Sequence, residues 1–156
     1  MREKGVRAIV REDQQSVCLD SCVEIFLRPG GLKGKYYMNF EMNCVGTLLL
    51  ARGRILPGNR RQLKLLPKED LKKIKRPTSL KEASKEITGE SIWYAGLEIP
   101  WDLVEKHTAV PRPGKGSVWT GNIYKCADWS RHPHWLAWKE VKTFHQPEGF
   151  GRLIFE

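Results

Sequence analysis

The chain contains no hydrophobic run long enough to cross a membrane as a helix. Its longest apolar stretch, "VGTLLLA" at 45–51, falls far short of the ~18 residues that such a helix needs, so we expect no membrane partner. The start, "MREKGVRAIVRED", lacks the apolar centre of a secretory signal. The sequence as it stands therefore predicts a cytoplasmic protein, whereas a true N-terminus upstream of Met1 would allow an extracellular or periplasmic one.

Motifs that indicate an enzyme are also missing. There is no glycine-rich phosphate loop and no motif supporting a Ser-His-Asp or Cys-His nucleophile. The four cysteines, at positions 18, 22, 44 and 126, show no paired CxxC spacing and are too few for a disulfide scaffold. We expect free, buried thiols, because an unoxidised cysteine packs as a small apolar residue.

Positive charge exceeds negative charge, with 27 Lys and Arg against 18 Asp and Glu and a net charge of +9. Much of the excess lies in residues 52–87, a polar and poorly patterned stretch. No helix-turn-helix, zinc-finger or RNA-binding aromatic signature accompanies it. We therefore interpret this stretch as a solvated excursion and expect no nucleic-acid partner, although the charge makes acidic glycans worth testing.

Alternating patterns predict strands over most of the chain. Residues 35–51 show a period of two, which is typical of a half-buried strand in an antiparallel sheet. The turn sequence "RPGGLKGK" joins this stretch to the alternating 21–27, so we expect a hairpin. Residues 52–90 are expected to be a long connection with a short helix over 80–87. Further strands are predicted at 5–10, 91–99, 118–127 and 151–156. Pro100, directly after Ile99, is expected to open a short helix.

This pattern predicts one domain over residues 1–156, an all-β antiparallel β-sandwich with long loops and one or two short helices. If Val23 and Met42 face the core, polar residues share the opposite face of the two best strands. Carboxylates and amides beside an aromatic ring are what sugar recognition requires. The alternative is an ordinary solvent-facing sheet surface. The residues of this polar face are Cys22, Glu24, Tyr37, Asn39, Glu41 and Asn43.

Three other constellations are weaker. Six tryptophans, four of them within 119–138, are mostly expected in the core, with one or two as stacking platforms on loops. "CADWSRHPHW" (126–135) offers metal ligands, but zinc sites usually show paired spacing. Glu24 and Glu41 could form a glycosidase pair, yet cross-strand neighbours lie closer than such pairs normally do.

Six segments in order resemble the carbohydrate-binding family 9-like proteins, relatives of the family 9 sugar-binding modules. The resemblance implies a jelly-roll-like sandwich with a sugar site made of polar groups and stacked aromatics, and it allows a structural calcium. By motif it assigns Glu24, Asn122 and Glu98 to that site. The segments are "DSCVEIFL", "YYMNFEMNCVGT", "WYAGLEIPW", "GNIYKCAD", "HPHWLAW" and "FHQPEGFGRLIFE".

Two departures accompany the resemblance. Such proteins often carry an aromatic shortly before the "DS·VE" glutamate, where this chain has Cys18. They also carry more chain before this motif, so the first strand or strands are expected to be missing here. An unpaired edge would allow a homodimer by edge pairing.

The sequence thus predicts non-catalytic binding of an oligo- or polysaccharide through a polar sheet face with aromatic stacking. The alternative is a structural or protein-interaction sandwich that has lost sugar binding. The predicted ligand-binding residues are Glu24, Tyr37, Asn39, Glu41, Glu98, Asn122, Tyr124 and Lys125.

Overall fold

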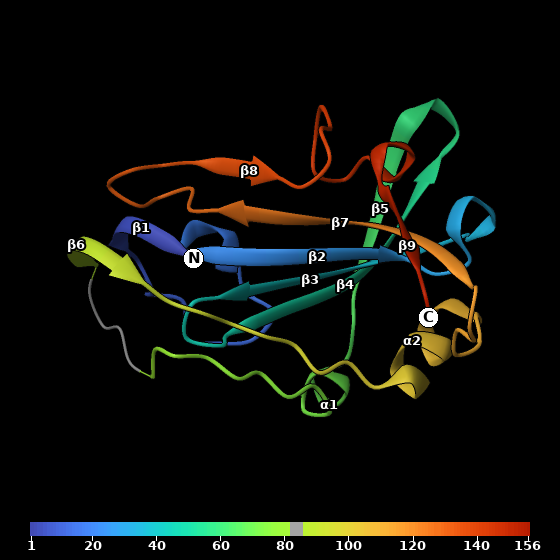
Figure 1. Cartoon of the computed structure of the whole chain (residues 1–156), viewed down its shortest axis with the longest axis horizontal. Coiled ribbons are helices and arrows are strands. Elements are labelled where there is room, and N and C mark those ends of the chain that lie inside the picture. Colours follow the sequence, from blue (N-terminus) through green and yellow to red (C-terminus); the bar gives the residue numbers. More distant parts are fainter. Residues whose placement is uncertain (82–85) are drawn as a thin grey trace.

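The computed structural model describes residues 1–81 and 86–156, and these are mostly β structure (Figure 1), with two short α-helices. None of the helices in the described ranges is long and apolar enough to span a membrane. The helices are α1 (Lys68–Leu71) and α2 (Trp101–Thr108). The strands are β1 (Arg2–Val6), β2 (Cys22–Arg28), β3 (Tyr37–Asn43), β4 (Leu48–Leu56), β5 (Arg60–Leu65), β6 (Ile87–Ile92), β7 (Val118–Cys126), β8 (Trp135–Ala137) and β9 (Gly151–Ile154).

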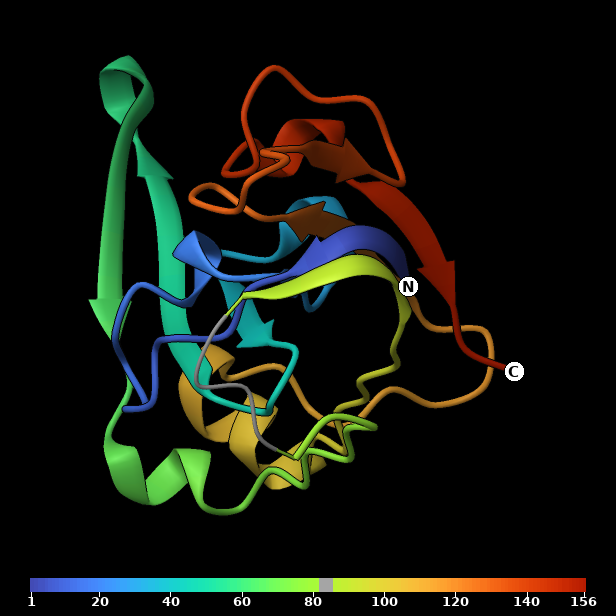
Figure 2. The ribbon, with the colours of Figure 1, turned by 90° about the vertical axis from the view of Figure 1, so that its left-hand side faces the viewer.

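The strands form two antiparallel sheets, which confirms the predicted β-sandwich. The larger sheet has the order β5-β4-β3-β2-β7-β8, and β9 also pairs with β7. The smaller sheet is the β1–β6 pair, whose two strands run side by side in Figure 2. Edge-mediated dimerisation stays a prediction.

The β2–β3 hairpin is confirmed, with the register that the alternation requires. Val23 lies opposite Met42 and Glu24 lies opposite Glu41. The turn between the strands uses Gly30, whose φ of +76° is readily adopted only by glycine. Because successive side chains of a strand point to opposite faces, the apolar and carboxylate positions separate as expected.

The prediction of a single strand over 35–51 is wrong, because a tight turn divides it into β3 and β4. The side-chain oxygen of Asn43 accepts hydrogen bonds from the backbone N–H of Val45 (3.3 Å) and Thr47 (2.9 Å). Gly46 completes the turn with a φ of +93°. Apolar residues continue beyond the turn as the run "LLLA" (48–51), and this is why the sequence pattern concealed the break.

The expectation of a long connection over 52–90 is also wrong at both ends. At its far end β6 begins at Ile87, and it stops at Ile92, before most of the strand predicted over 91–99. β4 continues to Leu56 and pairs with β5 through a turn in which Gly58 has a φ of +74°. Charged side chains recur along this hairpin, so its sequence does not show the apolar pattern that indicates a strand. The short helix expected over 80–87 falls mainly on residues 82–85, which lie outside the described residues.

One face of the large sheet packs on the main core. This face presents side chains such as Phe40 and Leu50 to Leu103 and Val104 of α2. Pro100 precedes α2 with an extended conformation, as the sequence predicted. A second cluster, which includes Val6 and Trp93, joins the β1–β6 pair to the same face. On the opposite face, the strands β2, β3 and β7 are free of this core.

Candidate functional site

Most of the predicted polar residues do share the face opposite the main core. Glu24 of β2 lies opposite Glu41 of β3 and Tyr124 of β7, and Phe26 lies opposite Asn39 and Asn122. Since directly paired residues in neighbouring strands point to the same face, these side chains form one surface across three strands. Tyr37, two residues before Asn39 in β3, belongs to it as well.

The segment from Trp138 to Phe150, which we call the covering loop, lies over part of this face. The amide of Asn122 exchanges two hydrogen bonds of 2.9 Å with the backbone N–H and C=O of Lys139. The hydroxyl of Tyr124 donates to the backbone oxygen of Phe144 at 2.9 Å. Asn122 and Tyr124 therefore hold the loop in place, and both are buried beneath it.

Beside the covering loop the same face opens into a cavity of about 290 Å³, which we call the Glu24–Glu41 pocket. Its floor is the sheet, and its rim comes from the loop and from the chain between β7 and β8. Of the residues predicted from sequence, only Glu24 and Glu41 line it. The lining residues are Cys18, Glu24, Glu41, Cys126, Asp128, Trp135, Phe144 and His145.

The two carboxyl groups at the floor are buried, with only 3% of Glu24 and 8% of Glu41 exposed. Burial raises the pKa of Glu24 well above its usual value, and the neighbouring Cys126 and Glu41 add to the shift. Burial also raises the pKa of Glu41, while a 2.6 Å hydrogen bond from Asn39 acts in the opposite direction. A carboxyl group shifted towards its protonated form can both donate to and accept from a hydroxyl group.

Aromatic rings stand at the rim of the pocket. Trp135 is 58% exposed, and its indole N–H donates to Asp128 at 2.8 Å. The ring of Phe144 stacks on that of Tyr124, with centroids 4.0 Å apart and an interplanar angle of 12°. The pocket thus combines carboxyl groups with flat apolar surfaces whose positions are fixed by neighbouring residues.

The structure does not bring Lys125 or Glu98 to this pocket. Lys125 lies opposite Val23 on the other face of the sheet, where its ammonium is buried 3.1 Å from a carboxylate oxygen of Glu3. Glu98 is exposed and pairs with Lys75 at 2.7 Å. In β7, Lys125 is adjacent to Tyr124, so the period of two already placed the two residues on opposite faces.

The sequence alone does not assign Asp128, Trp135, Phe144 and His145 to the site. The tryptophan-rich stretch 119–138 and the family segment that begins "FHQPEGF" contain these residues, but nothing in their spacing shows that they lie near Glu24. Their approach depends on the chain reversal after β7 and on the path of the covering loop.

Within the described residues, three metal-ligating side chains meet in one place. The ligand atoms of Cys22, Glu24 and Cys126 lie within 4.8 Å of one another, and all three residues are buried. All four cysteines are free; Cys22, Cys44 and Cys126 are buried as expected, whereas Cys18 is only half-buried. Two thiols and one carboxyl group suit a borderline-soft cation such as zinc, whereas calcium takes oxygen ligands.

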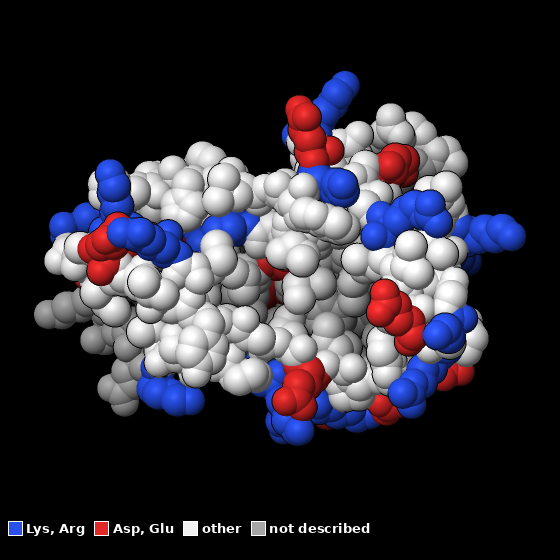
Figure 3. Space-filling model, in the orientation of Figure 1, with Lys and Arg blue, Asp and Glu red and all other residues white. Residues whose placement is uncertain are grey.

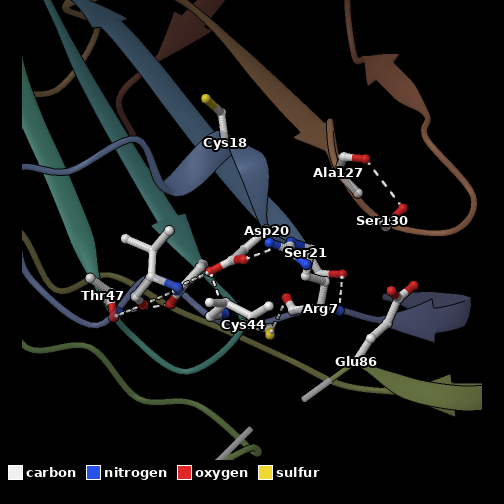
Figure 4. Close-up of polar contacts among 12 residues, drawn as sticks. Arg7, Cys18, Asp20, Ser21, Cys44, Thr47, Glu86, Ala127 and Ser130 are labelled. Atoms are coloured by element: carbon white, nitrogen blue, oxygen red, sulfur yellow. Dashed lines mark hydrogen bonds and ion pairs between the residues drawn. The ribbon is translucent and has the colours of Figure 1, made fainter. Parts of the chain in front are cut away.

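In the described part of the chain, the ligand atoms of the "CADWSRHPHW" stretch do not gather into a metal-ligating group of their own. Asp128 accepts a hydrogen bond from Trp135, and a ring nitrogen of His134 lies 2.7 Å from the backbone oxygen of His132. The buried Asp20 lies beside a positive charge, with one carboxylate oxygen 3.4 Å from Nε of Arg7. Its other oxygen accepts hydrogen bonds from the backbone N–H of Ile9 and Val10 (Figure 4 shows this region). We derive no role for calcium.

Comparison with known proteins agrees with the fold. The sequence profile of carbohydrate-binding family 9 matches residues 1–155. A crystal structure from Bacteroides uniformis ATCC 8492, of a protein whose name attributes carbohydrate binding to it, is 36% identical in sequence. The similarity covers 99% of this chain and 70% of that one, with a TM-score of 0.83. No curated protein matched the chain.

Proposed function

The chain belongs to carbohydrate-binding family 9, a family of non-catalytic modules, and we propose that it binds an oligo- or polysaccharide in the Glu24–Glu41 pocket. One observation carries this proposal. Glu24 and Glu41 are direct cross-strand partners, and they line the same cavity as the exposed ring of Trp135.

Each part of the pocket has a role in recognising a sugar. Glu24 and Glu41 supply neighbouring hydrogen-bonding groups for adjacent hydroxyls. Trp135 and Phe144 offer flat apolar surfaces to the C–H face of a pyranose ring. Asn39 keeps Glu41 oriented through its 2.6 Å hydrogen bond. In this arrangement Asn122, Tyr124 and Tyr37 act by positioning the covering loop, and Lys125 and Glu98 make no contact with the ligand.

Calorimetric titration of hits from a glycan array tests this proposal. We expect E24Q, E41Q and W135A each to weaken binding by roughly tenfold, because each removes a hydrogen-bonding carboxyl group or a stacking ring worth about 1–2 kcal/mol. E98Q and W129A are matched controls, since Glu98 and Trp129 are exposed but do not line the pocket. Unchanged affinity in the three pocket variants, or a loss in the controls, would place the site elsewhere.

A second candidate is an interaction module without sugar binding, and the covering loop favours it. The loop buries Asn122 and Tyr124 and so removes much of the predicted polar face from a ligand. This candidate predicts that the folded protein binds no sugar at millimolar concentration. Release of reducing sugar from a bound glycan would instead indicate an enzyme.

A further inference from the structure

A second hollow lies on the other face of the large sheet, at the edge formed by β3, β4 and β5. We call it the cationic groove, and its volume is about 380 Å³. We propose that it binds the carboxylate or sulfate groups of an acidic polysaccharide; the choice of a polysaccharide as ligand rests on the proposed carbohydrate function. The groove is lined by Tyr36, Arg52, Gly53, Arg54, Gln62, Leu63 and Lys64.

The strand register gathers the positive side chains on one face. Arg52 lies opposite both Met38 and Lys64, and Arg54 lies opposite Gln62. Met38 points into the main core. The cationic side chains therefore lie on the face of the sheet that carries this core, just beyond the core residues. The groove is therefore separated from the Glu24–Glu41 pocket by the thickness of the sheet.

The guanidinium groups are held in defined positions. The Arg52 guanidinium lies 4.1 Å above the centre of the Tyr36 ring and donates to the backbone oxygen of His107 at 2.9 Å. Arg54 donates to the side-chain oxygen of Gln62 at 2.6 Å. Preorganised guanidinium groups lose less conformational freedom on binding, and their geometry matches carboxylate and sulfate oxygens.

Within residues 1–81 and 86–156, no acidic side chain forms an ion pair with the cations of the groove. The ion pairs among the described residues involve other cations, and none of them includes Arg52, Arg54 or Lys64. Like charges directly opposite each other in a sheet are destabilising, so the Arg52–Lys64 pair costs stability in the free protein. A bound anion would relieve this repulsion.

The groove extends further along β5, which favours a polymer over a single small anion. A neighbouring hollow of about 280 Å³ shares Arg52 and Lys64 with it and continues to Pro67 and His107. By contrast, the face in Figure 3 shows basic and acidic side chains interspersed. A polyanion with repeated acidic groups could contact both hollows at once.

A nucleic acid fits this groove less well than an acidic glycan. Sequence-tolerant binding of single strands relies on open aromatic faces on which bases stack. Here the guanidinium of Arg52 covers one face of Tyr36, the one aromatic residue that lines the groove. Arginine and lysine side chains then remain as the main contacts, and these suit charged groups on a sugar chain.

Affinity electrophoresis in gels containing polygalacturonate, with binding constants from titration, tests the proposal. We expect R52Q/R54Q/K64Q to bind at least tenfold more weakly than the unmodified protein. The control R11Q/K115Q/R152Q removes the same charge from exposed positions outside the groove and should keep most of the affinity. The double variant R54Q/K64Q keeps the hydrogen bond from Arg52 to His107. Weaker binding by this variant therefore cannot be caused by the loss of that structural contact.

The possible outcomes separate this proposal from the function of the pocket. An equal loss in the groove and control variants would reveal non-specific charge attraction and overturn the proposal, as would no binding of polygalacturonate at 50 mM salt. Tighter binding of a single-stranded oligonucleotide than of polygalacturonate would overturn the choice of glycan. Neutral-sugar binding that depends on Trp135 is measured separately and should be unchanged in R54Q/K64Q.

Discussion

The phenolic oxygen of Tyr37 lies 2.9 Å from Nδ1 of His145, which follows it by 108 residues in the chain. This contact joins β3 to the covering loop at the side of the Glu24–Glu41 pocket. Burial, with the nearby Arg61, lowers the pKa of His145 to about 4. The neutral ring can accept a hydrogen bond from the hydroxyl group at Nδ1, whereas the protonated ring cannot.

Acidification should therefore weaken the attachment of the covering loop. The unfolded chain takes up a proton on His145 near pH 6.5, while the folded protein stays neutral at this residue down to about pH 4. The contribution of His145 to stability is thus fully present above pH 6.5 and decreases as the pH falls to about 4. Urea unfolding of the unmodified protein and of H145N between pH 7.5 and 4 measures this effect.

The free energy of unfolding of H145N should fall less steeply between pH 7.5 and 4 than that of the unmodified protein. Glu24 and Glu41, whose raised pKa values contribute a pH dependence of opposite sign, are present in both proteins. Their effect cancels in the difference. The same slope for both proteins would contradict the prediction.

Phe144 should stabilise the covering loop through its stacked contact with Tyr124. We expect F144A to lower the free energy of unfolding by about 2 kcal/mol, since it removes both the stacking and the half-buried ring. Y124F, which keeps the ring and removes only the hydroxyl bond to the loop, should cost about 1 kcal/mol. Chemical denaturation measures both values, and an equal cost would argue against the stack.

Asn122 should act on sugar binding only through the loop. N122A removes both hydrogen bonds to Lys139 and should cost about 1–2 kcal/mol of stability. Amide exchange at Lys139 should accelerate, together with a weaker affinity for the sugar. A loss of affinity without faster exchange would instead indicate direct contact between Asn122 and the ligand.

An aromatic residue in place of Cys18 should improve sugar binding. Cys18 lines the pocket, and burial raises its pKa to about 12, so it supplies no thiolate there at neutral pH. C18Y would add a stacking surface worth about 1 kcal/mol, or roughly a fivefold gain in affinity. C18S, which adds no ring, is the control. A gain with both variants would point to removal of the thiol as the cause.

The alternation of residues along single strands was enough to predict much of the sheet. It placed Glu24 and Glu41 on one face, and the turn residues after Arg28 predicted their hairpin, which the structure confirms. The same period of two, applied to β7, would have separated Lys125 from Tyr124. The turn at Gly46 was missed because the apolar pattern continues on both sides of it.

The sequence by itself determined which side chains share a face, because the two-residue repeat of a strand is a local property of the backbone. Only the tertiary structure decided which part of that face stays open. Trp135, Phe144 and His145 reach Glu24 through a chain reversal and a loop anchored by Tyr37, Asn122 and Tyr124. Such long-range contacts depend on the folded path of the whole chain and leave no local periodicity to detect.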